Sequence, residues 1–320
     1  MFIHEEALIA KVKEKEAARV KSQGGQQTDD RRKMLEETRA ELRRKNPLVM
    51  VWKFLFPFLL YSFSGEMFRQ LFGFVTLFIA DANEAFFNIM FVADDSDIDK
   101  LAITGNGNAI IQMLSLACVV IVLYKMGGGK ECLAKNKENI KKYSVGEWLA
   151  WGGISIALAA GLNMVFASTG LIAVSESYQE AAENLYAVGI PAGLLLYGIF
   201  SPIAEELLFR GIIFTQMKGF MKQFGSALLT SALFGAYHGN PVQFIYSVIF
   251  GMILAYAYHY SNDFKVPVVI HSVVNIIIFL TSSFGLLTGS SAQLVVGGVL
   301  TAAAIIGFVV LSKKYKKQEA

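Results

Sequence analysis

Two adjacent glutamates and an arginine interrupt an apolar stretch in "SPIAEELLFRG" (201–211). Ionisable groups inside a membrane-length apolar segment are costly and usually functional. On a helix, Glu206 and Arg210 lie four residues apart with the acid first, so they can form an ion pair. Glu205 points about 100° away and has no helical partner. A buried carboxylate of this kind can serve as a general base near neutral pH. Alternatively, all three residues form an ion-pair network that holds helices together.

A histidine follows in the next apolar segment, in "ALFGAYHGNP" (232–241). The two segments predict a helical hairpin with its turn near 219–224. Glu205 and His238 are almost equally far from that turn, so antiparallel helices would place them at one depth. Phe234 lies one turn before His238 on the same face and could pack against the imidazole. The alternative for His238 is a buried core histidine with no chemical role.

A third polar pair occurs in "VIHSVVNIII" (269–278). His271 and Asn275 are four residues apart on one helix face, and both can donate hydrogen bonds. Two such donors can stabilise an oxyanion, or they can simply join helices. His271 lies only about 9 Å from the turn expected at 261–265, whereas Glu205 and His238 lie deeper, measured from their own turn. One explanation is that the hairpin carrying Glu205 and His238 projects into the cytosol.

The remaining candidate residues form no recognisable site. We expect His259 at the membrane interface and His4 in the N-terminal tail. The sequence "GGGK" (127–130) reads as a loop and lacks the rest of a phosphate-binding motif. Cys118 and Cys132 have no metal or disulfide spacing. The sequence also lacks HExxH, and it lacks GxSxG in a strand context.

Composition indicates that these residues belong to a membrane protein. Of the 320 residues, 54% are hydrophobic and only 17% are charged. The net charge of +3 gives no reason to expect nucleic acid as a partner. We predict an all-α, polytopic bundle of about eight transmembrane helices. The expected spans are 50–80, 106–126, 147–170, 186–218, 224–239, 242–260, 266–287 and 291–311. The polar sequence "FSGEMFRQ" (63–70) interrupts the first span, part of which could lie in the membrane interface.

The distribution of charged residues divides the chain into an N-terminal tail, a membrane domain and a short C-terminal tail. Residues 1–46 are a charged tail with a hinge at "SQGGQQ" (22–27) and a solvated helix at 28–46, residues 47–312 are the membrane domain, and 313–320 are a basic tail. Loops 81–99 and 171–185 are acidic, whereas 125–142, 218–222 and 313–317 are rich in lysine. The positive-inside rule then places both termini in the cytosol of a multi-pass cell-membrane protein. The N-terminus does not read as a signal peptide.

Together these residues favour water-mediated hydrolysis of an amide. Glu205 and His238 could activate one water, and His271 and Asn275 could stabilise the tetrahedral oxyanion. This chemistry needs no covalent intermediate, cofactor or metal ion.

The motifs resemble those of a known family. "EELLFR" (205–210), "FGAYH" (234–238) and "HSVVN" (271–275) are similar, in order, to the EExxxR, FxxxH and HxxxN motifs of the CPBP (Abi) family. These intramembrane glutamic endopeptidases are related to Rce1-type CAAX prenyl proteases. The resemblance covers about 145–290 and implies an eight-helix core with a polar cavity open to the cytosol or membrane. It implies that Glu205 and His238 activate water and that His271 and Asn275 form the oxyanion site. Glu206, Arg210 and Phe234 are then supporting residues.

Partners and competing functions follow from the same residues. We expect membrane lipid and a peptide or membrane-anchored protein substrate, with or without a prenyl group. One alternative is a non-catalytic homologue that acts as an immunity or regulatory protein. A second is a metalloenzyme in which Glu205, His238 and His271 bind zinc. A third is a transporter with a Glu205–His238 proton relay, although no internal repeat supports it.

Overall fold

The fold is described from a computed structural model of the whole chain. It describes Leu35, Thr38 and residues 46–83, 90–94, 97–137, 139–286 and 289–319. Its contacts divide the chain into two units, Met1–Val51 and Trp52–Ala320. The predicted hinge at 22–27 lies outside the described residues, as does nearly all of the helix predicted at 28–46. In the first unit, the Asn46 side chain accepts a hydrogen bond from the Leu48 backbone N–H, at the start of the first long helix.

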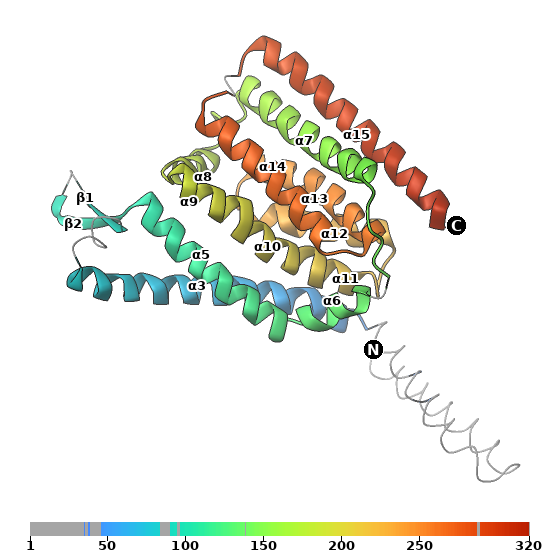
Figure 1. Ribbon diagram of the computed structural model, residues 1–320, viewed down its shortest axis with the longest axis horizontal. Coiled ribbons are helices and arrows are strands. Elements are labelled where there is room, and N and C mark those ends of the chain that lie inside the picture. The colour runs from blue at the N-terminus through green and yellow to red at the C-terminus, as the bar shows by residue number, and fades with distance from the viewer. Residues whose placement is uncertain are drawn as a thin grey trace, which may run out of the picture. The chain divides into compact units, whose positions relative to one another are not determined.

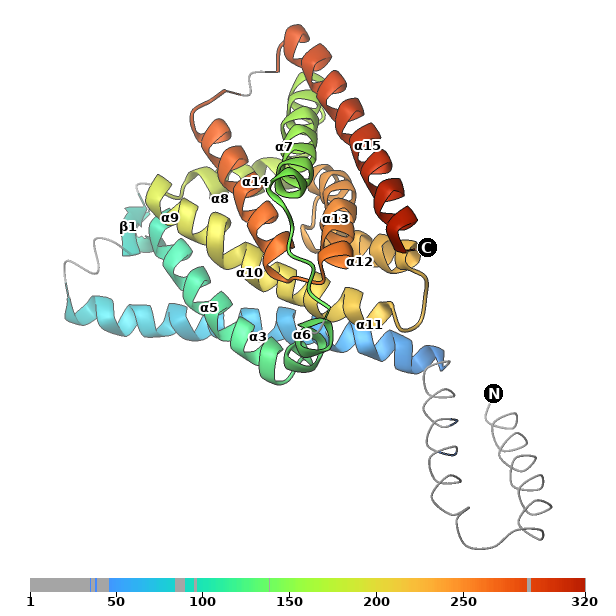
Figure 2. The same cartoon turned by 45° about the vertical axis from the view of Figure 1, so that its right-hand side comes forward.

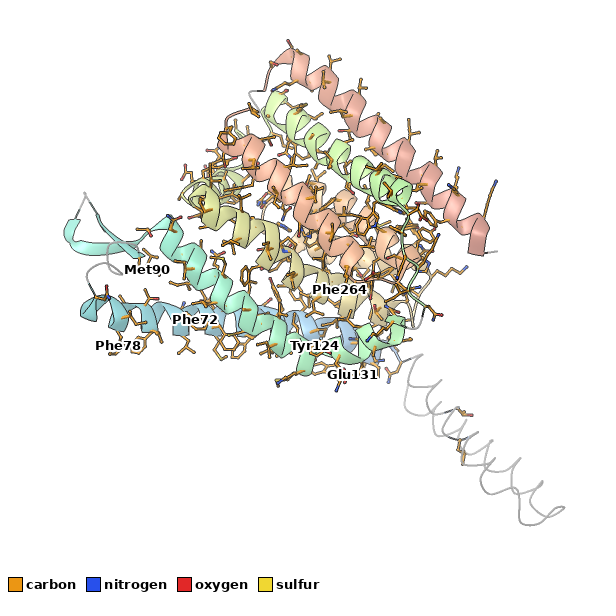
Figure 3. All side chains as sticks on the ribbon, viewed as in Figure 1. Phe72, Phe78, Met90, Tyr124, Glu131 and Phe264 are labelled. Atoms are coloured by element: carbon orange, nitrogen blue, oxygen red, sulfur yellow. The ribbon has the colours of Figure 1, made fainter. Side chains whose placement is uncertain are left out.

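The second unit is an almost entirely helical bundle (Figures 1 and 2). Its helices are α3 (Pro47–Ala82, which begins in the first unit), α5 (Gly105–Lys125), α6 (Gly129–Lys137), α7 (Val145–Ser168), α8 (Glu176–Tyr186), α9 (Ile190–Leu195), α10 (Ser201–Glu206), α11 (Thr215–Met217), α12 (Gln223–Tyr237), α13 (Pro241–Ser261), α14 (Lys265–Ser283) and α15 (Ser291–Glu319). Many large apolar side chains point outward, among them Phe78 of α3 and Tyr124 of α5 (Figure 3). A lipid environment accounts for that exposure. The chain is a polytopic helical membrane protein, as the sequence predicts.

Seven segments of the described chain are long and apolar enough to cross a membrane. They are Pro47–Ile79, Gly105–Lys125, Val145–Ser168, Ile190–Met217, Pro241–Ser261, Lys265–Ser283 and Ser291–Lys317. The fifth predicted span, 224–239, is not among them; it corresponds to α12, which has only 15 residues. At helical rise these cover about 22 Å, less than the roughly 30 Å of hydrocarbon. The predicted helix is therefore present but too short to cross the membrane unaided.

The first predicted span is not interrupted, contrary to expectation. Helix α3 runs unbroken through "FSGEMFRQ" and has 36 residues. Glu66 and Arg69 pair there at 2.7 Å, and Gln70 donates a second hydrogen bond to Glu66. These contacts neutralise the charges without breaking the helix.

Three segments predicted as loops contain regular structure. The acidic segment 171–185 is mostly helix α8, and the second half of "GGGK" is the first turn of α6. Part of the acidic loop 81–99 belongs to an antiparallel hairpin of β1 (Phe91–Asp94) and β2 (Asp97–Ile103). Phe91 pairs with Ile103, and the register shifts between Ala93 and Asp94. All three segments are short and polar, so hydropathy alone reads them as loops.

The glutamate-bearing segment 190–217 is one continuous helix with two widened turns. Between α9, α10 and α11 lie the π-helical segments η1 (Leu196–Phe200) and η2 (Leu207–Phe214). Pro202 lacks a backbone N–H and follows η1 directly, which explains why the regular hydrogen-bond ladder changes there. In η2 the Thr215 hydroxyl donates to the Arg210 carbonyl, five residues back. Widened turns of this kind are frequent at functional sites.

Helices α7 and α15 pack closely along their length (Figures 1 and 2). A Cβ added to Gly161 would lie 2.8 Å from the Gly297 carbonyl and 2.6 Å from the Thr301 hydroxyl. At the lysine-rich end of the pair, Glu147 accepts hydrogen bonds from Tyr315 at 2.6 Å and pairs with Lys141 at 3.0 Å. Small residues thus allow two apolar helices to approach, as is common in membranes.

We therefore expect Gly161→Ala to destabilise the fold by about 1–3 kcal/mol, because the new methyl group meets backbone atoms that cannot move aside. The matched control is Gly153→Ala on the same helix, where an added Cβ meets nothing within 4 Å. That control should be neutral or slightly stabilising, since alanine favours helix. Thermal unfolding in detergent compares the two. Equal unfolding temperatures for the two variants would show that α7 and α15 do not pack closely at Gly161.

Candidate active site

The three predicted motifs meet at one cavity of about 280 Å³. Glu205 comes from α10, His238 from the end of α12, and His271 and Asn275 from α14. All four line this cavity together with Phe234. The structure therefore brings together every residue that the sequence predicts to act directly.

Glu206 and Arg210 form the buried ion pair predicted from their spacing. Arg210 Nη1 donates to Glu206 Oε1 at 2.6 Å, and both side chains are completely buried. Arg210 Nη2 also donates to the carbonyl oxygen of Gly251 on α13 at 3.3 Å. The guanidinium lies 4.6 Å from the ring centroid of Phe234, a cation–π distance. The pair therefore connects α10 with α12 and α13 behind the cavity.

His271 lies between the two glutamates. Its Nδ1 is 2.7 Å from Glu206 Oε1, and its Nε2 is 3.7 Å from Glu205 Oε2. A carboxylate only accepts hydrogen bonds, so we assign the proton on Nδ1 to the bond with Glu206. Nε2 is then directed to Glu205, and it can donate only when the imidazole is protonated.

Glu205 is thus not free of partners, although its helix supplies none. The sequence predicts the absence of a helical partner correctly. It does not predict that His271, on a distant segment, approaches this carboxylate. Glu205 is 9% exposed, and it lines the cavity, whereas Glu206 is fully buried behind it. The two adjacent carboxylates therefore occupy different environments.

His238 ends α12 and is fixed by backbone contacts. Its Nδ1 lies 2.8 Å from the Phe234 carbonyl oxygen, which can only accept. We therefore assign the proton to Nδ1, which leaves Nε2 with a lone pair. Phe234 packs edge-on against His238 at 4.9 Å between ring centroids, so the contact predicted from their spacing is present. Gly239 follows with φ +73°, a conformation that suits glycine and turns the chain into α13.

Asn275 is held by a contact that the sequence did not indicate. Its amide Nδ2 donates to the Tyr197 carbonyl oxygen at 3.0 Å. Tyr197 lies in η1, and α14 approaches this segment closely, because a Cβ on Gly198 would lie 2.7 Å from the Ile276 side chain. Asn275 lines the cavity, so its second amide N–H is available to donate to a group bound there. The only feature of the sequence that pointed to this contact was Pro202, because a proline inside a helix marks an irregular turn nearby.

The depth mismatch predicted for His271 is absent. Counting residues from each turn places His271 nearer the lysine-rich loops than Glu205, yet their side-chain atoms lie 3.7 Å apart. Counting assumes that the turns at 219–224 and 261–265 lie at one depth, and the contact between His271 and Glu205 shows that this assumption fails. A projecting hairpin is therefore not needed to bring the two residues together.

Several lining residues were not predicted from the sequence. Helix α8 covers one side of the cavity with Tyr178, Ala181, Ala182 and Leu185. Ser247 of α13 is buried, with its hydroxyl 3.5 Å from His238 Nδ1. The spacing of the α8 residues, at i, i+3, i+4 and i+7, is an amphipathic signal that could have identified this helix.

Other predicted positions lie outside this cavity or outside the described chain. His259 of α13 is half-buried, with its ring beside Tyr260 and Phe214. His4 is not among the described residues. Within the described chain, no three His, Cys, Asp or Glu side chains are grouped so that they could hold a metal ion. The zinc site considered for Glu205, His238 and His271 is therefore not supported by their arrangement.

Comparison with known proteins agrees with this geometry. Residues 187–277 match the family model described as "Type II CAAX prenyl endopeptidase Rce1-like". This segment is Rce1-like. It contains Glu205, Glu206, Arg210, Phe234, His238, His271 and Asn275, that is, every residue of the three motifs.

The chain is also similar to a protein of Bacillus subtilis (strain 168). The protein named "Putative membrane peptidase YdiL" is 24% identical over 198 residues, which cover 58% of this chain and 78% of that relative. No solved structure matches the chain. The match to the family model and the arrangement of the cavity residues rest on different observations.

Proposed function

We propose that this protein is an intramembrane glutamic endopeptidase of the CAAX-protease-like type, which hydrolyses a peptide bond with an activated water. The observation that carries the proposal is that Glu205, His238, His271 and Asn275 line one cavity. The match to an Rce1-like model and the peptidase name of a relative support the same class.

Glu205 and His238 are proposed to activate the water. Among the described residues, Glu205 is the only carboxylate that lines the cavity. His238 has Nε2 available as a second acceptor, because Nδ1 donates to Phe234. Water would give one proton to Glu205 and attack the carbonyl carbon, forming a C–O bond. The same proton would pass to the leaving nitrogen as the C–N bond breaks, so the enzyme returns to its starting state.

His271 and Asn275 are proposed to stabilise the oxyanion. In its charged form His271 donates from Nε2, and Glu206 stabilises that charge through Nδ1. Asn275 would donate with its second amide proton, while Tyr197 holds the first. Fixed donors aimed at a developing oxyanion are among the strongest catalytic contributions. Glu206 and Arg210 are thus positioning residues.

Two candidates for a covalent nucleophile, Ser247 and Cys132, are not favoured by their surroundings. Ser247 lies near His238, but the nearest ring nitrogen, Nδ1, is the one that carries the proton and cannot deprotonate a hydroxyl. Burial raises the pKa of Cys132 in α6 to about 11, so its thiol stays protonated. Cys132 does not line the cavity either. Direct attack by water is therefore the better-supported mechanism.

The function is tested with purified protein in lipid and a mixed peptide library that includes prenylated CAAX peptides. We expect cleavage by wild type, its loss in Glu205→Ala, and no change with strong chelators. Cleavage by both proteins would contradict the proposal, as would inhibition by chelators that zinc reverses. A folded wild type that cleaves nothing would favour the non-catalytic homologue.

Asn275→Ala should lower kcat about 10²–10³-fold with little change in KM, the loss typical of one oxyanion donor. The control is Asn184→Ala on α8, whose amide contacts only its own helix through Glu180. Steady-state kinetics on any cleaved library peptide compares the two. Equal rates would remove Asn275 from the proposed oxyanion site.

A further inference from the structure

Helix α3 carries charged side chains on its outer face, inside the apolar span Pro47–Ile79. Glu66 lies about 28 Å from the start of that span and about 20 Å from its end at helical rise. The side chains of Glu66 and Arg69 are 55% and 47% exposed, and Gln70 beside them is exposed as well. Charged residues within a span almost always face the bundle interior or a water-filled cavity. These three residues, here called the α3 polar patch, face outward instead.

The opposite face of α3 packs against the bundle. Tyr61 is buried, and its hydroxyl lies 3.2 Å from that of Tyr237 on α12. The Ser115 hydroxyl of α5 donates to the Gly65 carbonyl at 2.8 Å. On the helix, Tyr61 points about 140° away from Glu66. The α3 polar patch therefore points away from the rest of the chain, toward whatever surrounds the bundle in the membrane.

The hydrogen bonds within the patch do not use all of its polar atoms. Arg69 donates to Glu66 from Nε at 2.9 Å and from Nη2 at 2.7 Å, and Gln70 Nε2 donates to Glu66 at 2.7 Å. Among the described residues, Arg69 Nη1 has no acceptor and Gln70 Oε1 has no donor. Lipid tails supply neither, so each unpaired group costs free energy there. The patch thus requires an acceptor and a donor from a neighbour in the membrane.

The patch lies within a row of residues spaced for helix pairing. Leu59, Ser62, Glu66, Arg69 and Gly73 follow one another at alternating intervals of three and four. This spacing forms the contact line of two helices that cross at a shallow left-handed angle. Ser62 and Gly73 are small and lie on either side of the patch, and a Cβ added to Gly73 meets nothing within 4 Å. Small residues at such positions let a second helix approach closely. The five residues are here called the α3 seam.

We propose that two copies of this chain pair in the membrane through the α3 seam, with their polar patches facing each other. Copies in one membrane share an orientation, so a two-fold axis along the membrane normal brings identical residues together at one depth. The patch complements itself, because Arg69 Nη1 of either copy can donate to Gln70 Oε1 of the other. A different partner would need its own donor and acceptor at this depth, whereas a second copy supplies both by symmetry.

The first test is disulfide cross-linking of the full chain in membranes. In a Cys118→Ser/Cys132→Ser background, Gly73→Cys places a thiol on the seam. The matched control is Leu71→Cys, which is 49% exposed but points about 140° away from Glu66. After oxidation with copper phenanthroline, we expect Gly73→Cys to give a species of twice the 35.2 kDa chain mass, and Leu71→Cys to give none. Ser62→Cys is a second reporter on the seam if Gly73→Cys does not fold.

The second test asks whether the patch itself holds the copies together. Single-molecule photobleaching counts labelled chains in liposomes at low protein-to-lipid ratio. We expect two bleaching steps for wild type and one for Glu66→Leu/Arg69→Leu/Gln70→Leu. Leucine suits a lipid-facing position, so this triple variant should keep its helical circular dichroism while it loses the dimer.

Four outcomes would overturn the proposal. Equal cross-linking at Gly73→Cys and Leu71→Cys would indicate random collision, and a single bleaching step for wild type would show a monomer. An undiminished dimer in the triple variant would show that the patch is not the contact. Cross-linking of Gly73→Cys to a different protein in place of a second copy would assign the seam to another partner. Neither test measures cleavage, so the proposed peptidase activity is judged separately.

Discussion

Replacing Glu205 by glutamine should lower kcat by about 10²–10⁴-fold and leave KM nearly unchanged. Glutamine has the same shape and can still contact His271, but it cannot accept the proton of the attacking water. The loss therefore belongs to the chemical step and not to binding. Steady-state kinetics in lipid, on a peptide cleaved by wild type, measures both constants.

The matched control for this change is Glu183→Gln on α8. Glu183 is exposed and does not line the cavity, so its kcat should equal that of wild type. A Glu205→Gln enzyme that keeps its kcat would exclude Glu205 as the base. A rise in KM with kcat unchanged would make it a binding residue instead.

The second large effect concerns stability. Arg210→Met should destabilise the protein by about 3–5 kcal/mol, because it leaves Glu206 buried without its cation. Arg210 also joins η2 to the Gly251 carbonyl on α13 and packs on Phe234. Chemical unfolding in detergent, followed by circular dichroism, measures the change.

Two further variants separate the buried ion pair from simple loss of a cation. Lys141→Met breaks the partly exposed Lys141–Glu147 pair at the lysine-rich end of α7 and should change stability little, because solvent screens that pair. The double variant Glu206→Gln/Arg210→Met removes the uncompensated charge and should recover part of the lost stability. A double variant less stable than Arg210→Met would show that the buried charge is not the cause.

Much of the fold was predictable because long apolar segments directly indicate helices that span the membrane. The helices at 105–125, 145–168, 190–217, 241–261 and 265–283 follow the predicted spans within a few residues. Helical spacing also predicted the Glu206–Arg210 pair and the Phe234–His238 contact. Both contacts are local, so one helix is enough to determine them.

The features that the sequence did not predict depend on contacts between distant segments. His271 contacts both glutamates because α14 packs against α10, and residue counting from separate turns does not reveal how two such helices are aligned. Asn275 is held by a backbone carbonyl in η1, which no side-chain pattern reveals. Helix α8 was read as a loop because its polar face dominates its composition, although its cavity-facing residues follow helical spacing.

The central claim is that water attacks the peptide bond directly, with Glu205 as the base. It is tested most directly by mass spectrometry of cleavage in H₂¹⁸O, with hydroxylamine present to trap any acyl-enzyme. The account predicts that each new C-terminus carries ¹⁸O and no hydroxamate, and that Glu205→Gln gives no product above the protein-free control. A hydroxamate product would show a covalent intermediate and contradict the mechanism, and so would undiminished cleavage by Glu205→Gln.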